Sequence, residues 1–98
     1  MTLKAKDVKP NMRRIDLELS IVEIEEPRSY VRRDGTQGRV TTAIAEDDSG
    51  RIKLSLWDAE IDRVKVGDRV KVTNGYARTF RDEVHVSAGI YGKLEVIK

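Results

Sequence analysis

Residues 51–58 of the chain read Arg-Ile-Lys-Leu-Ser-Leu-Trp-Asp, with apolar and polar side chains in strict alternation. Successive side chains of a β-strand point to opposite faces, so this stretch predicts a strand with one face in a core and the other in water. Trp57, the only tryptophan, then falls on the wet face in register with Lys53 and Arg51. An indole ring beside cations predicts a platform on which a flat ring can stack while the cations contact negative charge.

The length and composition restrict the class of protein. Ninety-eight residues form one domain with one core, so we expect residues 1–98 to be a single domain. The chain has no cysteine and one histidine, which excludes disulfides, thiolate zinc sites and multi-histidine metal centres within it. No apolar run approaches the roughly 20 residues of a membrane span, and the N-terminus lacks a signal-like apolar region. We therefore expect a cytoplasmic protein with no membrane partner.

The charge balance points weakly to a polyanionic partner. Charged residues make up 37% of the chain, but the formal net charge is only +2. The isoelectric point of about 9.0 favours a polyanion. Because the net charge is small, the distribution of the basic residues carries more information than their sum.

The first 26 residues predict a lead-in followed by a long, bent strand. Residues 1–13 are mostly polar and basic, and we expect a solvated lead-in with a turn at residues 8–12, a ligand site being the alternative. Apolar residues then alternate at Ile15, Leu17, Leu19 and Ile21, before the pattern slips to the other parity at Val22 and Ile24. A one-residue slip is what a β-bulge produces, and a bent first strand is typical of a small closed barrel.

Residues 27–39 lack a core pattern and contain Asp34-Gly35, which predicts a long hairpin loop. The loop holds one aromatic residue, Tyr30, among four cations: Arg28, Arg32, Arg33 and Arg39. A flexible polar hairpin is one interpretation. Arginines around an aromatic ring favour the other, which is contact with an anion.

Residues 40–46 predict the second strand and residues 47–50 a turn. We expect the small side chains of this strand to face outward and leave space beside Trp57; these are Thr41, Ala43 and Ala45. Asp47-Asp48-Ser49-Gly50 is a composition typical of a tight turn. The two acids also allow a metal or general-acid site, but the sequence shows no further ligands nearby.

Residues 58–68 break the alternation after the third strand. Ile61 and Val64 have the spacing of a single short helical turn. A fourth strand then follows, in which Val70 and Val72 face the core. Asn74-Gly75 is a strong hairpin signal, but the strand pattern continues through it, so we expect a bulge.

Residues 76–80 predict a second row of aromatic and basic side chains. If Ala77 and Thr79 face inward, the outer surface receives Tyr76, Arg78 and Phe80. The opposite parity would bury both rings, and it would also bury Arg78 without a partner, which is costly.

Residues 84–88 predict the fifth strand, and residues 89–98, including Tyr91, a final extended segment. Val84 and Val86 face the core, which places His85 and Ser87 on the outer face with the aromatic rings. We interpret His85 as a polar neighbour of the rings; a catalytic role is the alternative.

Together these elements predict an all-β fold with one short helix between strands 3 and 4. Five strands in this order, with a bulged first strand, are typical of the OB-fold, a five-stranded Greek-key barrel. Strands 2 and 3 of that fold, with the loops joining strands 1–2 and 4–5, bind oligonucleotides and oligosaccharides. In this chain those places hold the arginine-rich loop, the strand with Trp57, and the hairpin whose first strand carries Tyr76 and Phe80.

The chain resembles the archaeal single-stranded DNA-binding proteins of simple one-OB architecture, and their relatives in replication protein A and the eukaryotic sensor-of-ssDNA proteins. The resemblance extends from about residue 5 to about residue 95. It is carried by Val8-Lys9-Pro10-Asn11-Met12, Asp47 to Trp57, Val66-Gly67-Asp68, Asn74 to Phe80, and Ala88-Gly89. The combination of Trp57 with Asn74-Gly75-Tyr76 and Phe80 is the more specific part, since the turn at residues 47–51 occurs in many OB-folds.

The resemblance implies a set of site residues. It implies that three aromatic residues stack on bases, namely Trp57, Tyr76 and Phe80. It also implies that basic residues of the strand 1–2 loop contact the DNA backbone, namely Arg28, Arg32 and Arg33. Some relatives carry a further aromatic residue in strand 5, where this chain has Ser87. The patterns in the chain itself add Tyr30, Lys53, Arg78, His85 and Ser87 to the expected nucleic-acid-binding surface.

We therefore expect sequence-tolerant binding of single-stranded DNA, in replication, recombination or repair, without a cofactor or a metal. About three stacking rings predict a site of about 4–6 nucleotides. One alternative is an RNA- or tRNA-binding module, because stacking serves either sugar. Another is a protein-interaction module that binds replication or repair proteins. We expect no enzymatic activity, since no nucleophile–base pair, metal-ligand set or phosphate-cradling glycine loop is visible.

Overall fold

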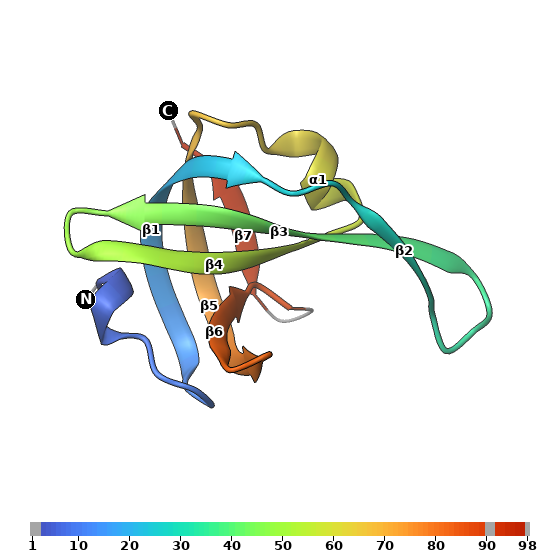
Figure 1. Ribbon diagram of the computed structural model, residues 1–98, viewed down its shortest axis with the longest axis horizontal. Helices are drawn as coiled ribbons and strands as arrows, with labels where there is room; N and C mark the ends of the chain where they lie inside the picture. Colours follow the sequence, from blue (N-terminus) through green and yellow to red (C-terminus); the bar gives the residue numbers. More distant parts are fainter. Residues whose placement is uncertain (1–2, 90–91, 98) are drawn as a thin grey trace.

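The computed structural model describes residues 3–89 and 92–97, which form a closed β-barrel with a projecting arm (Figure 1). Around the barrel the order is β1 (Arg13–Ile24), β3 (Gln37–Asp47), β4 (Gly50–Trp57), β6 (Glu83–Ser87) and β5 (Arg69–Phe80). Pairing of β1 with β5 closes the ring. All neighbours are antiparallel except β4 and β6, which run parallel. The prediction of a five-stranded barrel is confirmed.

Four short elements complete the described part of the fold. η1 (Ala5–Asp7) precedes β1, and β7 (Lys93–Val96) pairs with β5. α1 (Ala59–Arg63), between β4 and β5, confirms the predicted short helix. β2 (Arg28–Val31) pairs with the first part of β3 and builds the arm that extends beyond the barrel in Figure 1. Tyr91 of the expected final segment lies outside the described residues.

The core is formed by alternate residues of the long strands. Among the residues that the structure describes, eight large side chains are less than 2% exposed, including Leu17 and Leu19 of β1, Leu54 and Leu56 of β4, and Val72 of β5. Burying each such side chain contributes about 1.5–3 kcal/mol to stability. The register of β1 against β3 shifts between Ile21 and Glu23, which confirms the predicted bulge.

β3 presents to the core the face that was expected to point outward. Thr41, Ala43 and Ala45 are at most 2% exposed. Residues directly opposite in an antiparallel pair share a face, and these three lie opposite Leu56, Leu54 and Ile52. The expectation that the small residues leave space beside Trp57 is therefore wrong, because the large apolar side chains of β4 assign that face of β3 to the core.

β5 runs without interruption through Asn74-Gly75, which confirms a bulge rather than a hairpin. Gly75 pairs with Ile15 and Val72 pairs with Leu17, so β5 uses three steps where β1 uses two. Asn74 adopts a φ of 55°. Ala77 faces the core as expected, but Thr79 is exposed. Beyond Tyr76, β5 pairs only with β6, so its end projects past the barrel.

The segment before β1 is attached to the barrel rather than fully solvated. Ala5 and Val8 are buried, which corrects the expectation for the lead-in. The Asp47 carboxylate accepts a hydrogen bond from the Ala5 N–H at 2.7 Å, and others from the N–H and hydroxyl of Ser49. Burial opposes ionisation of Asp47, but these hydrogen bonds outweigh it and lower its pKa. The tight turn at residues 47–50 is confirmed, with Asp47 as its anchor.

Candidate nucleic-acid interface

A concave face over β3, β4, β5 and β6 brings the three predicted stacking rings together. It holds a cavity of about 210 Å³ that is lined by Arg28, Val40, Thr42, Ser55, Trp57, Tyr76, Arg78, Phe80, His85 and Ser87. Seven of these ten were expected on the nucleic-acid-binding surface from the sequence. Val40, Thr42 and Ser55 are additional; the wrong parity assigned to β3 concealed the first two.

The strand registers explain why these side chains share one face. β6 lies between β4 and β5 in the barrel. Its Ser87 pairs with Tyr76, and its His85 pairs with both Arg78 and Lys53. Residues in register on neighbouring strands project to the same side. The outer residues of β4, β6 and β5 therefore form a continuous surface.

Two side chains hold Trp57 in place. Its indole Nε1 donates a hydrogen bond to the Ser87 hydroxyl at 3.1 Å. The Tyr30 ring packs against it edge to face, with centroids 5.4 Å apart and planes at 87°. Ser87 is only 3% exposed. The strand-5 position that carries an aromatic ring in some relatives therefore supports the indole here.

Phe80 is the most open of the rings, with 48% of its surface exposed. It packs edge to face on His85 at 5.6 Å, and the guanidinium of Arg81 lies 5.2 Å from its ring centroid. His85 is 8% exposed, so it lies beneath Phe80 as part of the floor. Burial first, and then the positive charge of Lys53, lower the pKa of His85 below its ordinary value. At neutral pH the imidazole of His85 is therefore uncharged.

Asp58, which the sequence analysis did not single out, joins the arm to the aromatic face. Its carboxylate accepts hydrogen bonds from Arg32 Nη2 at 2.5 Å, the Arg39 N–H at 3.0 Å and the Tyr30 hydroxyl at 3.4 Å. The hydrogen bond from Arg32, followed by that from Arg39, lowers the pKa of Asp58. The partners lie at least 19 residues away along the chain, so no local pattern identifies this contact.

Gly38 allows the arm to pack closely. It pairs with Tyr30 across the β2–β3 ladder and is buried beneath that ring. A Cβ at this position would lie 2.7 Å from two carbons of the Tyr30 ring. The glycine therefore leaves room for the Tyr30 ring, which contacts Trp57.

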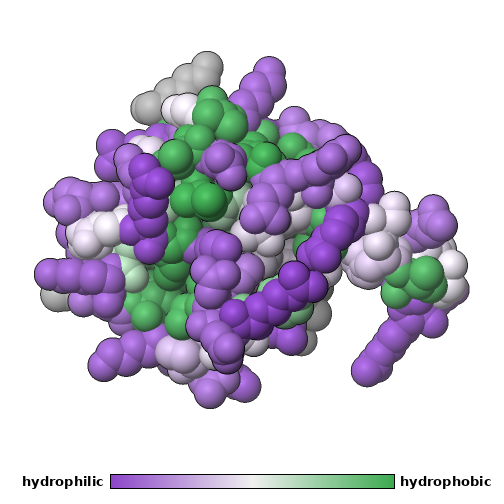
Figure 2. Space-filling view, in the orientation of Figure 1, coloured by the Kyte–Doolittle hydropathy of each residue, from purple (hydrophilic) through white to green (hydrophobic). Residues whose placement is uncertain are grey.

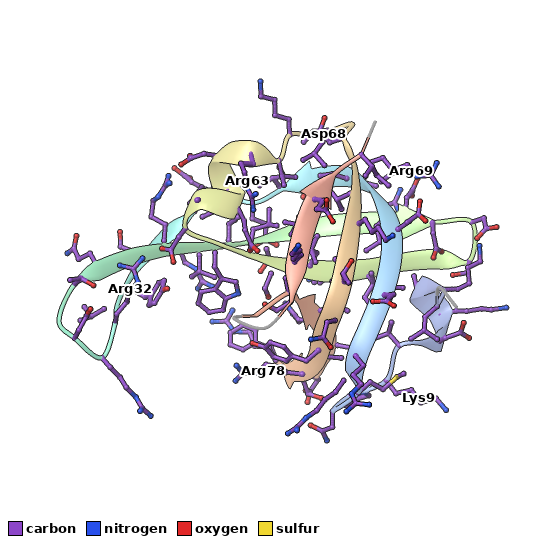
Figure 3. All side chains as sticks on the ribbon, turned by 180° about the vertical axis from the view of Figure 1, so that it is seen from behind. Lys9, Arg32, Arg63, Asp68, Arg69 and Arg78 are labelled. Carbon is purple, nitrogen blue, oxygen red and sulfur yellow. The ribbon has the colours of Figure 1, made fainter. Side chains whose placement is uncertain are left out.

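The cations of the site fall into two groups. Arg32 is engaged by Asp58 and also donates to the Gln37 carbonyl oxygen at 2.7 Å, so it holds the arm in place. Lys53 pairs with Glu83 at 2.9 Å, and this contact raises the pKa of Lys53. In residues 3–89 and 92–97, the expected contact residues without an ion pair are Arg28, Arg33 and Arg78. Figure 3 shows Arg32 on the arm and Arg78 at the end of the barrel where β1 begins.

The arm adds a small apolar area to a mostly polar surface. Figure 2 shows a hydrophobic area on the arm surrounded by hydrophilic residues, and Val31 of β2 is 69% exposed.

In the described part of the chain, no helix is long and apolar enough to span a membrane. Nor do the described His, Asp and Glu side chains gather anywhere as a group of three that could hold a metal ion.

The chain is similar to a number of known proteins, and three of them illustrate the likeness. The single-stranded DNA binding protein Ssb of Saccharolobus solfataricus is 31% identical over 94 residues, which cover 96% of this chain and 63% of that protein. Replication factor A of Methanothermobacter thermautotrophicus is 39% identical over 84 residues, which cover 85% of this chain and 10% of that protein. The second OB-fold domain of replication protein A from Methanococcus maripaludis has a TM-score of 0.80 and 26% identity, covering 100% of this chain and 96% of that domain.

The chain thus spans less than two thirds of the length of these two curated relatives. The family model for the Ssb-like single-stranded DNA binding proteins with an OB-fold matches residues 8–96. This range includes the barrel and all the rings of the concave face. Because the match covers almost the whole chain, the chain belongs to the Ssb-like, OB-fold family of single-stranded DNA binding proteins.

Proposed function

We propose that this protein binds single-stranded DNA with little sequence preference, by stacking bases on Trp57, Tyr76 and Phe80. The observation that carries the proposal is the open cavity in which these three rings meet Arg28 and Arg78. Every base has a π-face, and stacking on an aromatic ring contributes about 1–3 kcal/mol per base whichever base is present. Duplex DNA hides these faces, so it binds much more weakly.

The phosphates are contacted by three arginines that have no carboxylate partner among the described residues. Arg28 and Arg78 line the cavity, and Arg33 lies exposed on the arm. Each phosphate that is neutralised releases counterions, so the affinity falls by about 0.7 log units per log unit of salt for each contact. With three rings we propose a site of about 4–6 nucleotides per domain. We propose that this binding serves DNA replication, recombination or repair, and the name of one curated relative, Replication factor A, supports the first of these.

Titration of the Trp57 fluorescence with oligo-thymidylate tests the proposal, since Trp57 is the only tryptophan. A base that stacks on the indole should quench its emission at low salt, and added salt should reverse the quenching. Unchanged fluorescence, together with no change in the anisotropy of a labelled oligonucleotide, would sink the proposal. Competition by matched RNA oligomers distinguishes DNA binding from RNA binding, because only contacts to the 2′-hydroxyl separate the two.

Two substitutions separate the binding face from the rest of the surface. Phe80→Ala removes a ring that is 48% exposed, and Val66→Ala removes an apolar side chain that is 60% exposed on the segment between α1 and β5. Phe80→Ala should weaken binding while the protein stays folded, and Val66→Ala should leave binding unchanged. Equal affinities for both variants and the wild type would show that the rings do not contact the oligonucleotide. Capture of replication or repair proteins by such a non-binding protein would favour a protein-interaction module instead.

A further inference from the structure

A second groove continues from the aromatic face around the end of the barrel. It encloses about 780 Å³ where the start of β1 meets the bulge of β5. Tyr76 and Arg78 line both this groove and the cavity between the rings. The two depressions therefore adjoin each other at Tyr76 and Arg78.

The groove is basic and contains no acid among its lining residues. Its cations are Arg13, Arg14 and Arg78, and all three are exposed. Within the described ranges none of the three has an ion pair or a hydrogen-bond partner for its guanidinium. Six other basic residues of the described chain do have carboxylate partners. Three adjacent arginines left without one form a ready site for an anion.

An irregular backbone places both Arg13 and Arg14 on the outside. Regular alternation from the buried Ile15 would turn Arg13 toward the core. The register of β1 against β5 shifts between Arg13 and Ile15 instead, and Arg14 adopts a φ of 56°. Asn11 and Asn74, with φ values of 70° and 55°, line the same groove. The positive φ of Arg14 costs energy that the surrounding structure must offset.

We propose that this groove carries the phosphodiester backbone of single-stranded DNA beyond the base stacked on Tyr76. This inference rests on the proposed function and extends it. Arg13 pairs directly with Tyr76 across β1 and β5, and both residues line the groove. Among the described residues that line the groove there are three cations, and Tyr76 is the only aromatic one. The groove therefore contacts phosphate groups rather than bases, which distinguishes it from the concave face.

The test separates phosphates from bases. The wild type is titrated with an oligo-thymidylate of about five nucleotides, and with the same oligomer extended by about four abasic nucleotides at either its 5′ or its 3′ end. The extension adds phosphates without bases to stack. We expect one of the two extensions to tighten binding, and the end at which it does so gives the strand direction across Tyr76.

The variant Arg13→Gln/Arg14→Gln should lose this gain and keep its affinity for the unextended oligomer within about twofold. Two missing phosphate contacts should reduce the salt slope of the extended oligomer by about 1.4, so its affinity changes about sevenfold less between 50 and 200 mM salt. The matched control is Arg63→Gln/Lys65→Gln, which removes the same charge beside α1. Figure 3 shows Arg63 at the opposite end of the barrel from Arg78.

Three results would overturn the inference. Neither extension changes the affinity of the wild type, or the arginine variant retains the gain, or the control loses as much as the arginine variant does. In each of these cases the unextended oligomer still binds, so the proposed function survives. Failure of the wild type to bind any of the oligomers would overturn both together.

Discussion

The indole Nε1 of Trp57 donates a hydrogen bond to the hydroxyl of Ser87 across 3.1 Å. The donor lies at the end of β4 and the acceptor at the end of β6, so the bond joins two strands whose register pairs lie nearer the middle of β4. Ser87 is nearly inaccessible to water, whereas Trp57 is half-buried. The central ring of the concave face is thus fixed by a polar contact beneath it.

Ser87→Ala should loosen this ring. Loss of the hydrogen bond should lower the free energy of unfolding by about 1 kcal/mol, and the affinity for oligo-thymidylate should fall several-fold because the indole is no longer oriented. Urea denaturation and Trp57 quenching measure the two effects. Ser55→Ala is the matched control, since Ser55 lines the same cavity from β4. If both variants lose the same stability and affinity, the hydrogen bond has no orienting role.

Phe80 should be the ring whose removal separates binding from folding most cleanly. It is 48% exposed and projects past the barrel on the last residue of β5. Phe80→Ala should cost about 1–3 kcal/mol of binding free energy, the value of one stacked base, with little change in the urea midpoint. Phe80→Tyr keeps the ring and should bind like the wild type. A loss of binding in Phe80→Tyr equal to that in Phe80→Ala would contradict stacking.

The aromatic face could be predicted from the sequence because alternation determines it on β4, and alternation together with one bulge determines it on β5. On β4 the large residues Leu54 and Leu56 leave no doubt about the inner face, and Trp57 follows on the outer one. On β5 the same reasoning depended on treating Asn74-Gly75 as a bulge, and the register against β1 confirms that choice. A hairpin at this point would have ended the strand before Tyr76 and Phe80 could share a face with Trp57.

The parity of β3 could not be predicted in this way. Apolar residues occur at both parities of this strand, with Val40 and Ile44 on one face and Ala43 and Ala45 on the other. Size favours burying the larger pair, but the partner decides: Ala43 lies opposite Leu54 and is fully buried. The roles of the arm residues were also hidden, because Arg32 meets Asp58 only through a contact 26 residues away in the chain.

We expect a substitution of Asp58 to release the arm without unfolding the barrel. Asp58→Asn keeps the shape of the side chain but removes the charge that Arg32 and Tyr30 contact. We expect the Tyr30–Trp57 ring contact to weaken, seen as a loss of ring-current shifts and cross-relaxation between the two rings, with a several-fold loss of affinity. Asp62→Asn is the control, since Asp62 pairs with Arg39 alone among the described residues. Ring contacts that are unchanged in Asp58→Asn would show that Asp58 does not position the arm.

We expect the protein to lose stability in mildly acidic solution because of His85. Its pKa in the folded protein lies below the ordinary 6.5, because of burial and then the charge of Lys53, although Glu83 and Glu25 oppose the shift. The unfolded chain therefore binds the proton first, so the stability attributable to neutral His85 is complete above about pH 6.5 and declines as the pH falls toward the folded-state pKa.

Urea denaturation at a series of pH values from about 8 to 5 measures this effect in the wild type and in His85→Gln. The wild type should lose stability below about pH 6.5, and the variant should lose less. Glu60, whose pKa is raised by burial, acts in the opposite direction, but it is present in both proteins. The difference between the two curves therefore isolates His85. Parallel curves would contradict a depressed pKa, and would mean that the imidazole beneath Phe80 is solvated well enough to ionise as it does in the unfolded chain.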